Sequence, residues 1–363
     1  MSMVLVLSRL FAAAIILVGG MLGANPAHAA SINGQDYVAL ADWARGNGFY
    51  GFTRNHGLEI VLTNRTARLV FDVDSAQAEI NGVNVRLSFP VASQKNIPSI
   101  SQLDIDTSIR PLIFPQKLSA NEITTICLDP GHGGKDSGNR AGSHYEKNYT
   151  LPLALELRGQ LKKLGFKVIL TRVTDAFVDL PARPAIANKN GADLFISLHF
   201  NAAQADKNEV AGPETYCITP VGAASSNAHG ESGEFGSAIG DGATTANRFE
   251  NRSLLLAYQM EKSLVQNLNA TDRGVRRARF AVLRDAAMPA ILIEGGYMTN
   301  PTEGKKIYDP AYRKQMAAAI VNGILNYQRL TAPPIPPAIT TVTNPANRNK
   351  VSTVKIQPSK TSP

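Results

Sequence analysis

Residues 126–134 read Ile-Cys-Leu-Asp-Pro-Gly-His-Gly-Gly, an apolar run that stops at Asp129 and is followed by His132 in a glycine loop. Proline and glycine end a strand, and glycines let the backbone turn tightly around whatever the histidine binds. Two further apolar runs end at His199 and at Glu294. In open α/β sheets the chemistry gathers where strands reach their carboxyl ends. These three strand ends therefore predict one shared site.

The segment from 121 to 330 alternates strand-like and helix-like patterns, and Gly165 ends the first long helical pattern. Strands alternating with helices imply right-handed crossovers and a mostly parallel sheet. We expect an α/β catalytic domain at 121–330, with a mostly parallel twisted sheet flanked by helices. Strands are predicted at 123–128, 167–171, 194–198, 214–219 and 290–293, and helices at 148–164, 183–190, 252–268 and 311–330.

Residues 30–115 are expected to form a small α+β accessory domain that precedes the catalytic one. This segment resembles the small module named for its similarity to the N-terminal domain of copper amine oxidases, and we expect a wall-binding or spacer role. Residues 91–110 have few apolar residues in periodic array and are predicted to form loops. The pattern predicts a hairpin at 32–38, a short helix at 40–46 and strands at 58–63, 67–72 and 78–87.

Both ends of the chain differ in composition from a folded domain. In residues 1–29, Arg9 precedes an apolar run and a small-x-small site ends at Ala29, which predicts a secretory signal peptide; an uncleaved membrane anchor is the alternative. No later segment is apolar enough to cross a bilayer, so we expect no transmembrane anchor after cleavage. Residues 331–363 are rich in Pro, Thr and Ser, contain no acidic residue, and are expected to be a disordered basic tail.

The composition favours an exported globular protein with acidic partners. The net charge of +8 and pI near 9.4 suit anionic wall polymers, and no nucleic-acid module is present in the sequence. The apolar fraction of 44% and the charged fraction of 18% are those of a folded protein. The two cysteines, Cys127 and Cys217, lie in apolar runs, which predicts buried free thiols although export would permit a disulfide.

The strand-end residues have the donor types of a zinc site. Catalytic zinc is usually held by three protein ligands that leave a fourth position for water. His132 and His199 supply two imidazoles, and Glu146 is the best-placed third ligand because it stands at the start of the predicted helix at 148–164. His144 is its rival. His229, in the irregular glycine-rich stretch after the predicted strand at 214–219, is a weaker candidate.

Glu294 is then available as a general base. A carboxylate beside activated water can take its proton and later return it to the departing nitrogen, so no nucleophilic serine or cysteine is needed. A lone histidine at a strand end is often only a core residue, and a glycine loop can cradle phosphate. However, Gly134-Lys135 is followed by Asp136, without the spacing of a P-loop. A buried carboxylate ending a strand is costly without a task. The residues therefore predict zinc-dependent amide hydrolysis.

The ordered set of motifs resembles the zinc-dependent N-acetylmuramoyl-L-alanine amidases of the third amidase family. The resemblance extends from about 123 to 328, and it implies that this segment is a peptidoglycan hydrolase. It implies zinc binding by His132, Glu146 and His199 and a catalytic role for Glu294. The matching segments are Asp129-Pro-Gly-His-Gly-Gly, Glu146-Lys-Asn, Thr171-Arg-Val-Thr-Asp, Ser197-Leu-His-Phe-Asn-Ala and Glu294-Gly-Gly-Tyr-Met-Thr-Asn.

The resemblance also implies a substrate and partners. The bond cleaved would be the amide between the lactyl group of N-acetylmuramic acid and L-alanine of the stem peptide. Asn201 and Arg276 are candidate substrate-binding residues, Zn²⁺ is the expected cofactor, and peptidoglycan the expected partner. A protein activator is a further candidate partner, and the periplasm, or otherwise the cell wall, the expected location. A zinc carboxypeptidase acting on the stem peptide and a non-catalytic wall-binding protein are the alternatives.

Overall fold

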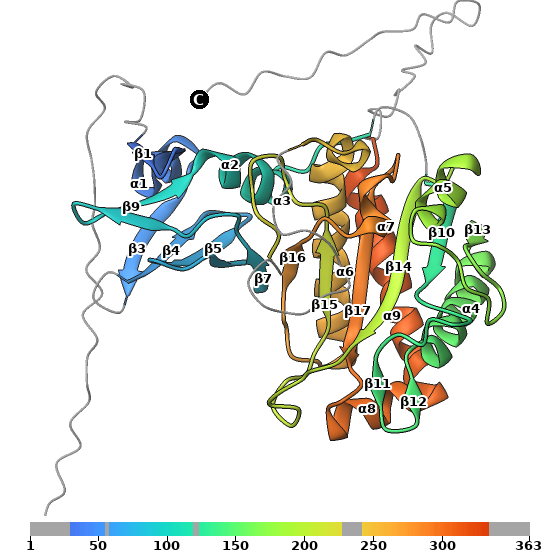
Figure 1. Ribbon diagram of the computed structural model, residues 1–363. Coiled ribbons are helices and arrows are strands. Elements are labelled where there is room, and N and C mark those ends of the chain that lie inside the picture. The colour runs from blue at the N-terminus through green and yellow to red at the C-terminus, as the bar shows by residue number, and fades with distance from the viewer. Residues whose placement is uncertain (1–29, 55–57, 119–122, 227–241, 334–363) are drawn as a thin grey trace, which may run out of the picture.

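The computed structural model describes residues 30–54, 58–118, 123–226 and 242–333 (Figure 1). The predicted signal peptide, His229 and nearly all of the predicted tail lie outside the described residues. None of the helices within the described ranges combines the length and the hydropathy that a membrane span requires.

Residues 123–333, the C-terminal unit, are built around a twisted sheet with helices on both faces (Figure 1). Every neighbouring pair of its strands is parallel except β15 with β17, which is antiparallel. The expected α/β class, with a mostly parallel sheet flanked by helices, is therefore confirmed. In spatial order the strands are β13 (Lys167–Leu170), β10 (Thr125–Pro130), β14 (Leu194–Asn201), β17 (Ala290–Tyr297), β15 (Glu214–Cys217) and β16 (Val275–Arg277).

Long helices cover one face of this sheet and shorter ones the other. The first face carries α4 (Lys147–Lys163), α6 (Glu250–Leu268) and α9 (Pro310–Thr331). The opposite face carries α5 (Ala182–Lys189) and α7 (Ala281–Arg284), with η3 (Thr245–Phe249) beside α7. The sequence pattern does not predict α8 (Pro301–Tyr308), a short helix that begins where the Asn300 side chain accepts hydrogen bonds from the first free backbone N–H groups. A small hairpin, β11 (Arg140–Ala141) with β12 (His144–Tyr145), leads into α4.

Residues 30–118, the N-terminal unit, contain two groups of strands and little helix. The predicted hairpin and the predicted helix at 40–46 are both present. A four-stranded sheet has the order β1 (Ala30–Ile32), β2 (Gln35–Ala39), β9 (Ile97–Ser101) and β8 (Ala92–Gln94), with α1 (Leu40–Gly46) beside it. An antiparallel meander follows the chain through β3 (Tyr50–Arg54), β4 (Glu59–Thr63), β5 (Arg68–Asp72), β6 (Gln77–Ile80) and β7 (Val83–Arg86).

The prediction of loops over 91–110 is wrong. This segment forms β8, β9, the short helix α2 (Gln102–Asp104) and the π-helical turn η2 (Ile105–Ile109), and α3 (Arg110–Ile113) follows. Val91, Ile100, Ile105 and Ile109 are buried, but a buried carboxylate, Asp104, interrupts their spacing. Asp104 accepts hydrogen bonds from the backbone of Ser88 and Phe89 and from the hydroxyls of Ser101 and Ser108. Such a polar centre ties the segment together without producing a periodic apolar pattern.

The two units share one sheet and one core. Strand β7 pairs with β16, so the meander and the C-terminal strands make a continuous 11-stranded sheet. A single cluster of buried apolar side chains runs from Leu40 and Phe71 in the N-terminal unit to Leu256 and Tyr327 in helices α6 and α9. A second, smaller cluster lies on the opposite face of the C-terminal strands. Cys127 and Cys217 are buried free thiols, as predicted.

Candidate metal centre

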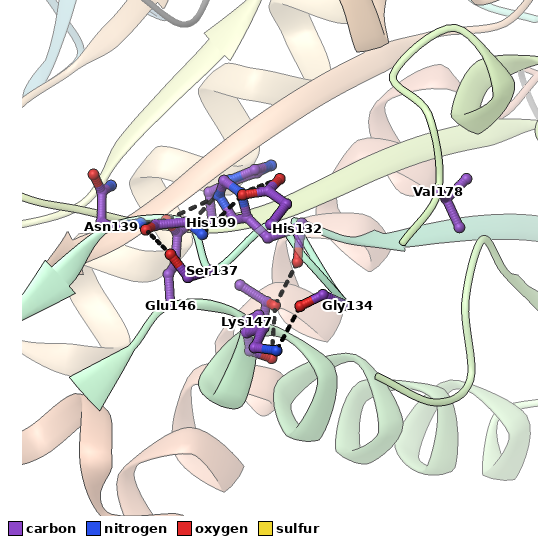
Figure 2. Close-up of polar contacts among 12 residues, drawn as sticks. His132, Gly134, Ser137, Asn139, Glu146, Lys147, Val178 and His199 are labelled. Atoms are coloured by element: carbon purple, nitrogen blue, oxygen red, sulfur yellow. Dashed lines mark hydrogen bonds and ion pairs between the residues drawn. The ribbon is translucent and has the colours of Figure 1, made fainter. Parts of the chain in front are cut away.

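Three predicted ligand residues meet at the carboxyl ends of β10 and β14. His132 lies in the loop after β10, His199 near the end of β14, and Glu146 immediately before α4. Figure 2 shows the three side chains pointing toward one another beside the first turn of α4, where Lys147 lies. One donor atom from each lies within 4.8 Å of the others, and all three residues are buried. The sequence therefore located correctly which residues come together.

His199 and Glu146 form a hydrogen bond with each other, whereas one nitrogen of His132 is left without one. The Nε2 atom of His132 lies 2.9 Å from Oε2 of Glu146, yet it makes no hydrogen bond with any described residue. The other carboxylate oxygen of Glu146 lies 2.9 Å from Nδ1 of His199. A buried imidazole nitrogen without a hydrogen bond is costly unless something else occupies its lone pair. Two imidazoles and a carboxylate are the donor set that suits Zn²⁺, so the residues fit this ion.

Surrounding polar groups fix the orientation of the His132 and Glu146 side chains. Asp136 lies 2.8 Å from Nδ1 of His132, the arrangement in which a carboxylate orients a metal-binding imidazole. The backbone N–H groups of Asn139 and Phe200 donate to the two oxygens of Glu146. Sequence patterns did not single out Asp136, although its place four residues after His132 was the available clue.

The charges in this cluster shift the pKa values of His132 and Glu146. Burial alone would lower the pKa of His132, whereas the charge of Glu146 and the contact with Asp136 raise it to about 10. Burial opposes the charged form of Glu146, but contacts with His132 and His199 hold the pKa of that carboxyl well below its usual range. The cluster thus stabilises positive charge at its centre. A dication would take over that role and would require the imidazoles in their neutral form.

A buried ion pair holds the His132 loop in place. Arg183 is 1% exposed and donates to Oδ1 of Asp129, to the carbonyl of Pro130 and to the carbonyl of His132. Arg172 donates to the carbonyl of Gly131. The backbone of His132 has a positive φ of 62°, a conformation that costs a non-glycine residue energy and needs such support. Buried arginines on a helix leave no distinct sequence pattern, which is why Arg183 was not predicted.

Glu294 lies beside the ligand cluster in one row of side chains. It pairs with His199 across β14 and β17, and with Glu214 across β17 and β15, so the three residues share one face of the sheet. Glu294 is 8% exposed, and its Oε2 atom has no hydrogen-bond partner among the described residues. Burial raises the pKa of Glu294 well above its usual range, and the charges of Glu146 and Glu214 raise it further. This is an environment for a carboxyl group that exchanges a proton.

Glu214 anchors the wall of the site next to Glu294. It is fully buried, and its carboxylate accepts hydrogen bonds from Nδ2 of Asn201 at 2.6 Å and from the hydroxyl of Tyr297 at 3.1 Å. Its other oxygen lies 2.7 Å from Nε of Arg276. The structure thus brings Asn201 and Arg276, both predicted to contact substrate, to the same side of Glu294. Sequence patterns missed Glu214, although a carboxylate directly before an apolar run was the available clue.

His144, the rival ligand candidate, does not join the cluster. Its ring stacks on Tyr308 with 3.7 Å between ring centroids, and its Nδ1 atom contacts the hydroxyl of Tyr149. These contacts anchor the β11–β12 hairpin to α4 and α8. His144 therefore has a structural environment of its own, two residues before Glu146.

Comparison with known proteins identifies the family. A model of the N-acetylmuramoyl-L-alanine amidase family matches residues 126–326, more than half of the chain. The chain belongs to this family. This amidase-family chain is 33% identical over 203 residues to the uncharacterized protein YqiI of Bacillus subtilis, a match that covers 56% of the chain and 84% of YqiI.

Two named amidases show the same extent of similarity. The N-acetylmuramoyl-L-alanine amidase AmiC of Neisseria meningitidis is 34% identical over 218 residues, which cover 56% of this chain and 52% of AmiC. The chain thus spans about half the length of that relative. Among solved structures, the amidase AmiC2 of Nostoc punctiforme is 32% identical, with a TM-score of 0.47 and coverage of 58% of this chain and 99% of that one.

The glycines of the site provide a matched test in this amidase-family chain. Gly138 and Gly142 have φ of +63° and +61°, so alanine at either position costs about 1–2 kcal/mol of backbone strain. A Cβ atom at Gly138 would lie 2.5 Å from Cδ2 of His132 and 2.6 Å from Oε2 of Glu146, whereas at Gly142 nothing lies within 4 Å. Gly138→Ala is expected to weaken Zn²⁺ binding at least about tenfold, because it displaces two ligands.

The measurement is a titration with Zn²⁺ against a competing chelator, accompanied by thermal unfolding. Gly142→Ala should lose only the stability that the backbone strain costs and keep the Zn²⁺ affinity of the wild type. Equal affinities in the two variants would contradict the assignment of this cluster as the metal centre.

Proposed function

We propose that this protein hydrolyses the amide bond between N-acetylmuramic acid and L-alanine in peptidoglycan, with Zn²⁺ held by His132, Glu146 and His199. The main support is the row that places Glu294 directly beside the ligand cluster, with its Oε2 atom unpaired among the described residues. The family match over the same segments supports the amidase chemistry. A zinc ion in this cluster would supply Lewis-acid chemistry, polarising a carbonyl and making water more acidic.

The protein side of the reaction rests on Glu294. Its raised pKa lets the carboxyl group take a proton from the attacking water and keep it in a buried environment. It can then return that proton to the nitrogen of L-alanine as the amide bond breaks. Asp136 keeps the imidazole of His132 in place through these steps, because its carboxylate contacts the ring nitrogen that points away from Glu146.

We propose that Arg276 and Asn201 bind substrate beside Glu294. Arg276 is 25% exposed at its side chain, so part of its guanidinium surface can reach a ligand while Nε faces Glu214. The stem peptide carries carboxylates, which a guanidinium recognises well. Peptidoglycan lies outside the cytoplasm, so we also propose that residues 1–29 act as a signal peptide and that the protein works in the periplasm or cell wall, with 30–115 as the accessory and 121–330 as the catalytic domain.

Digestion of purified peptidoglycan tests the proposal. The protein is expected to release stem peptides with a free L-alanine amine and to leave the glycan chains intact. A chelator such as 1,10-phenanthroline should abolish release, and added Zn²⁺ should restore it, because the ligand cluster has no substitute for the cation. Mass spectrometry of the soluble fragments identifies the bond cleaved.

The products separate the alternatives. Single amino acids released from the peptide end would indicate a carboxypeptidase and contradict the amidase assignment. Protein that contains zinc stoichiometrically, binds peptidoglycan and releases no fragments, with or without extracts that could supply a protein activator, would indicate a wall-binding role.

A further inference from the structure

The N-terminal unit contacts the C-terminal unit at the strand that carries Arg276. Val85 of β7 pairs with Val275 of β16, and two further hydrogen bonds join Asn84 to Asp272, one of them from the Asn84 backbone at 2.7 Å. A Cβ atom at Gly274 would lie 2.8 Å from the carbonyl oxygen of Asn84, so the two backbones approach closely. Strand β16 thus lies between the N-terminal meander and the candidate site (Figure 1).

Neighbouring residues of β16 point to opposite faces of the sheet, as the pleat requires. Arg276 reaches Glu214 on the face of the candidate site. Arg277 is 2% exposed and points to the other face, where it donates to the carbonyl of Ile218 at 3.1 Å and to the carbonyl of Thr107 in the N-terminal unit. One buried guanidinium therefore ties the N-terminal unit to the strand that supports Glu214.

Burying a guanidinium costs free energy unless its N–H groups find acceptors. Arg277 donates two hydrogen bonds to backbone carbonyls, one in each unit. Its Nε atom has no hydrogen-bond partner among the described residues. The same strand has only three residues, so β16 alone makes few ladder hydrogen bonds. It pairs with β15 at three positions and with β7 at one, and the contact of Arg277 with Thr107 adds a second attachment on the side of the N-terminal unit.

From this arrangement we infer that the N-terminal unit is part of the catalytic apparatus, and that Arg277 is a positioning residue acting through Arg276. By fixing β16, the N-terminal unit sets where Arg276 lies, and Arg276 in turn orients Glu214 and Asn201 beside Glu294. The inference rests on the proposed function for its kinetic consequence. It differs from a spacer or wall-binding role, since the unit would be needed even for small soluble substrates.

A double-mutant cycle in the full chain tests this inference with a soluble muramyl peptide as substrate. Arg277→Ala is expected to lower kcat/KM by about tenfold, chiefly by raising KM, with unchanged zinc content. In an Arg276→Ala background the same change should lower kcat/KM by less than about twofold, because the residue through which it acts is gone. Additive losses, or no loss in Arg277→Ala alone, would overturn the inference.

Arg279 supplies the matched control. It is another buried arginine, two residues along the chain, and its guanidinium donates to the carbonyls of Ala223 and Pro220 within the C-terminal unit. Any loss of kcat/KM in Arg279→Ala should add to the loss in Arg276→Ala, since these two hydrogen bonds of Arg279 do not reach the N-terminal unit. If Arg277→Ala does not fold, Arg277→Lys replaces it in the cycle, because an ammonium keeps the charge but cannot span both carbonyls.

Hydrogen exchange provides a readout that does not depend on activity. Peptides covering 214–219 and 272–280 should exchange at least about tenfold faster in Arg277→Ala than in the wild type, while β10 and β14 stay protected. Unchanged exchange in 214–219 would overturn the inference even if the protein proved inactive. A wild type without hydrolytic activity but with the expected exchange would instead contradict only the proposed function.

Discussion

Glu294→Ala is expected to keep its zinc and to lose peptide release, with kcat/KM falling by about 10²–10⁴-fold. The zinc ligands proposed are His132, Glu146 and His199, and the hydrogen bonds that orient His132 and Glu146 come from Asp136, Asn139 and Phe200. The loss should therefore fall on proton transfer alone. Zinc content by mass spectrometry and kinetics on a soluble muramyl peptide check both halves of the prediction.

Glu294→Gln is the matched control for size. It keeps the volume of the side chain in its buried position but cannot accept a proton, so its activity should be as low as that of the alanine variant. Retained activity in either variant would remove Glu294 as the general base. Loss of zinc in both would make Glu294 a ligand and would reopen the role assigned to Glu146.

The strand-end residues were predictable because local pattern and topology agree. The apolar runs before His132, His199 and Glu294 are continuous, as expected of strands covered on both faces. Parallel strands carry their carboxyl ends to one edge, so the meeting of His132 and His199 followed from the strand assignments. Glu146 followed from its place before a strongly periodic helix.

Other features depend on pairing, which a sequence pattern does not encode. The contact of β7 with β16 involves a single residue pair, Val85 with Val275, and Asn84 contributes through its backbone N–H as well as its side chain. Every residue except proline has a backbone N–H group, so a hydrogen bond from the backbone cannot be inferred from the residue type. The segment around Asp104 was misjudged for a similar reason: its order comes from hydrogen bonds to a buried carboxylate, whereas sequence patterns detect mainly apolar spacing.

Glu146→Gln is expected to lose zinc, whereas His144→Ala keeps it, although both positions belong to the same turn into α4. The glutamate is fully buried between the two imidazoles and supplies the negative charge that a dication requires, while glutamine keeps only a neutral oxygen. Loss of a direct ligand should lower the Zn²⁺ affinity by more than the about 10–100-fold that follows the loss of a residue that only hydrogen-bonds a ligand. His144 faces Tyr308 and Tyr149 instead, so its removal should lower mainly the stability of the hairpin.

Zinc titration and thermal unfolding of the two variants, measured together, distinguish the two roles. For Glu146→Gln, thermal unfolding without zinc should occur at a lower temperature than in the wild type, because the buried carboxylate that pairs with His132 is lost, although the amide oxygen can still accept from the backbone N–H groups of Asn139 and Phe200. The stabilisation that added zinc gives the wild type should disappear in this variant, since a ligand stabilises only the state that binds it. The reverse result, with zinc lost in His144→Ala and kept in Glu146→Gln, would require the hairpin to turn His144 away from Tyr308 and into the cluster when the ion binds.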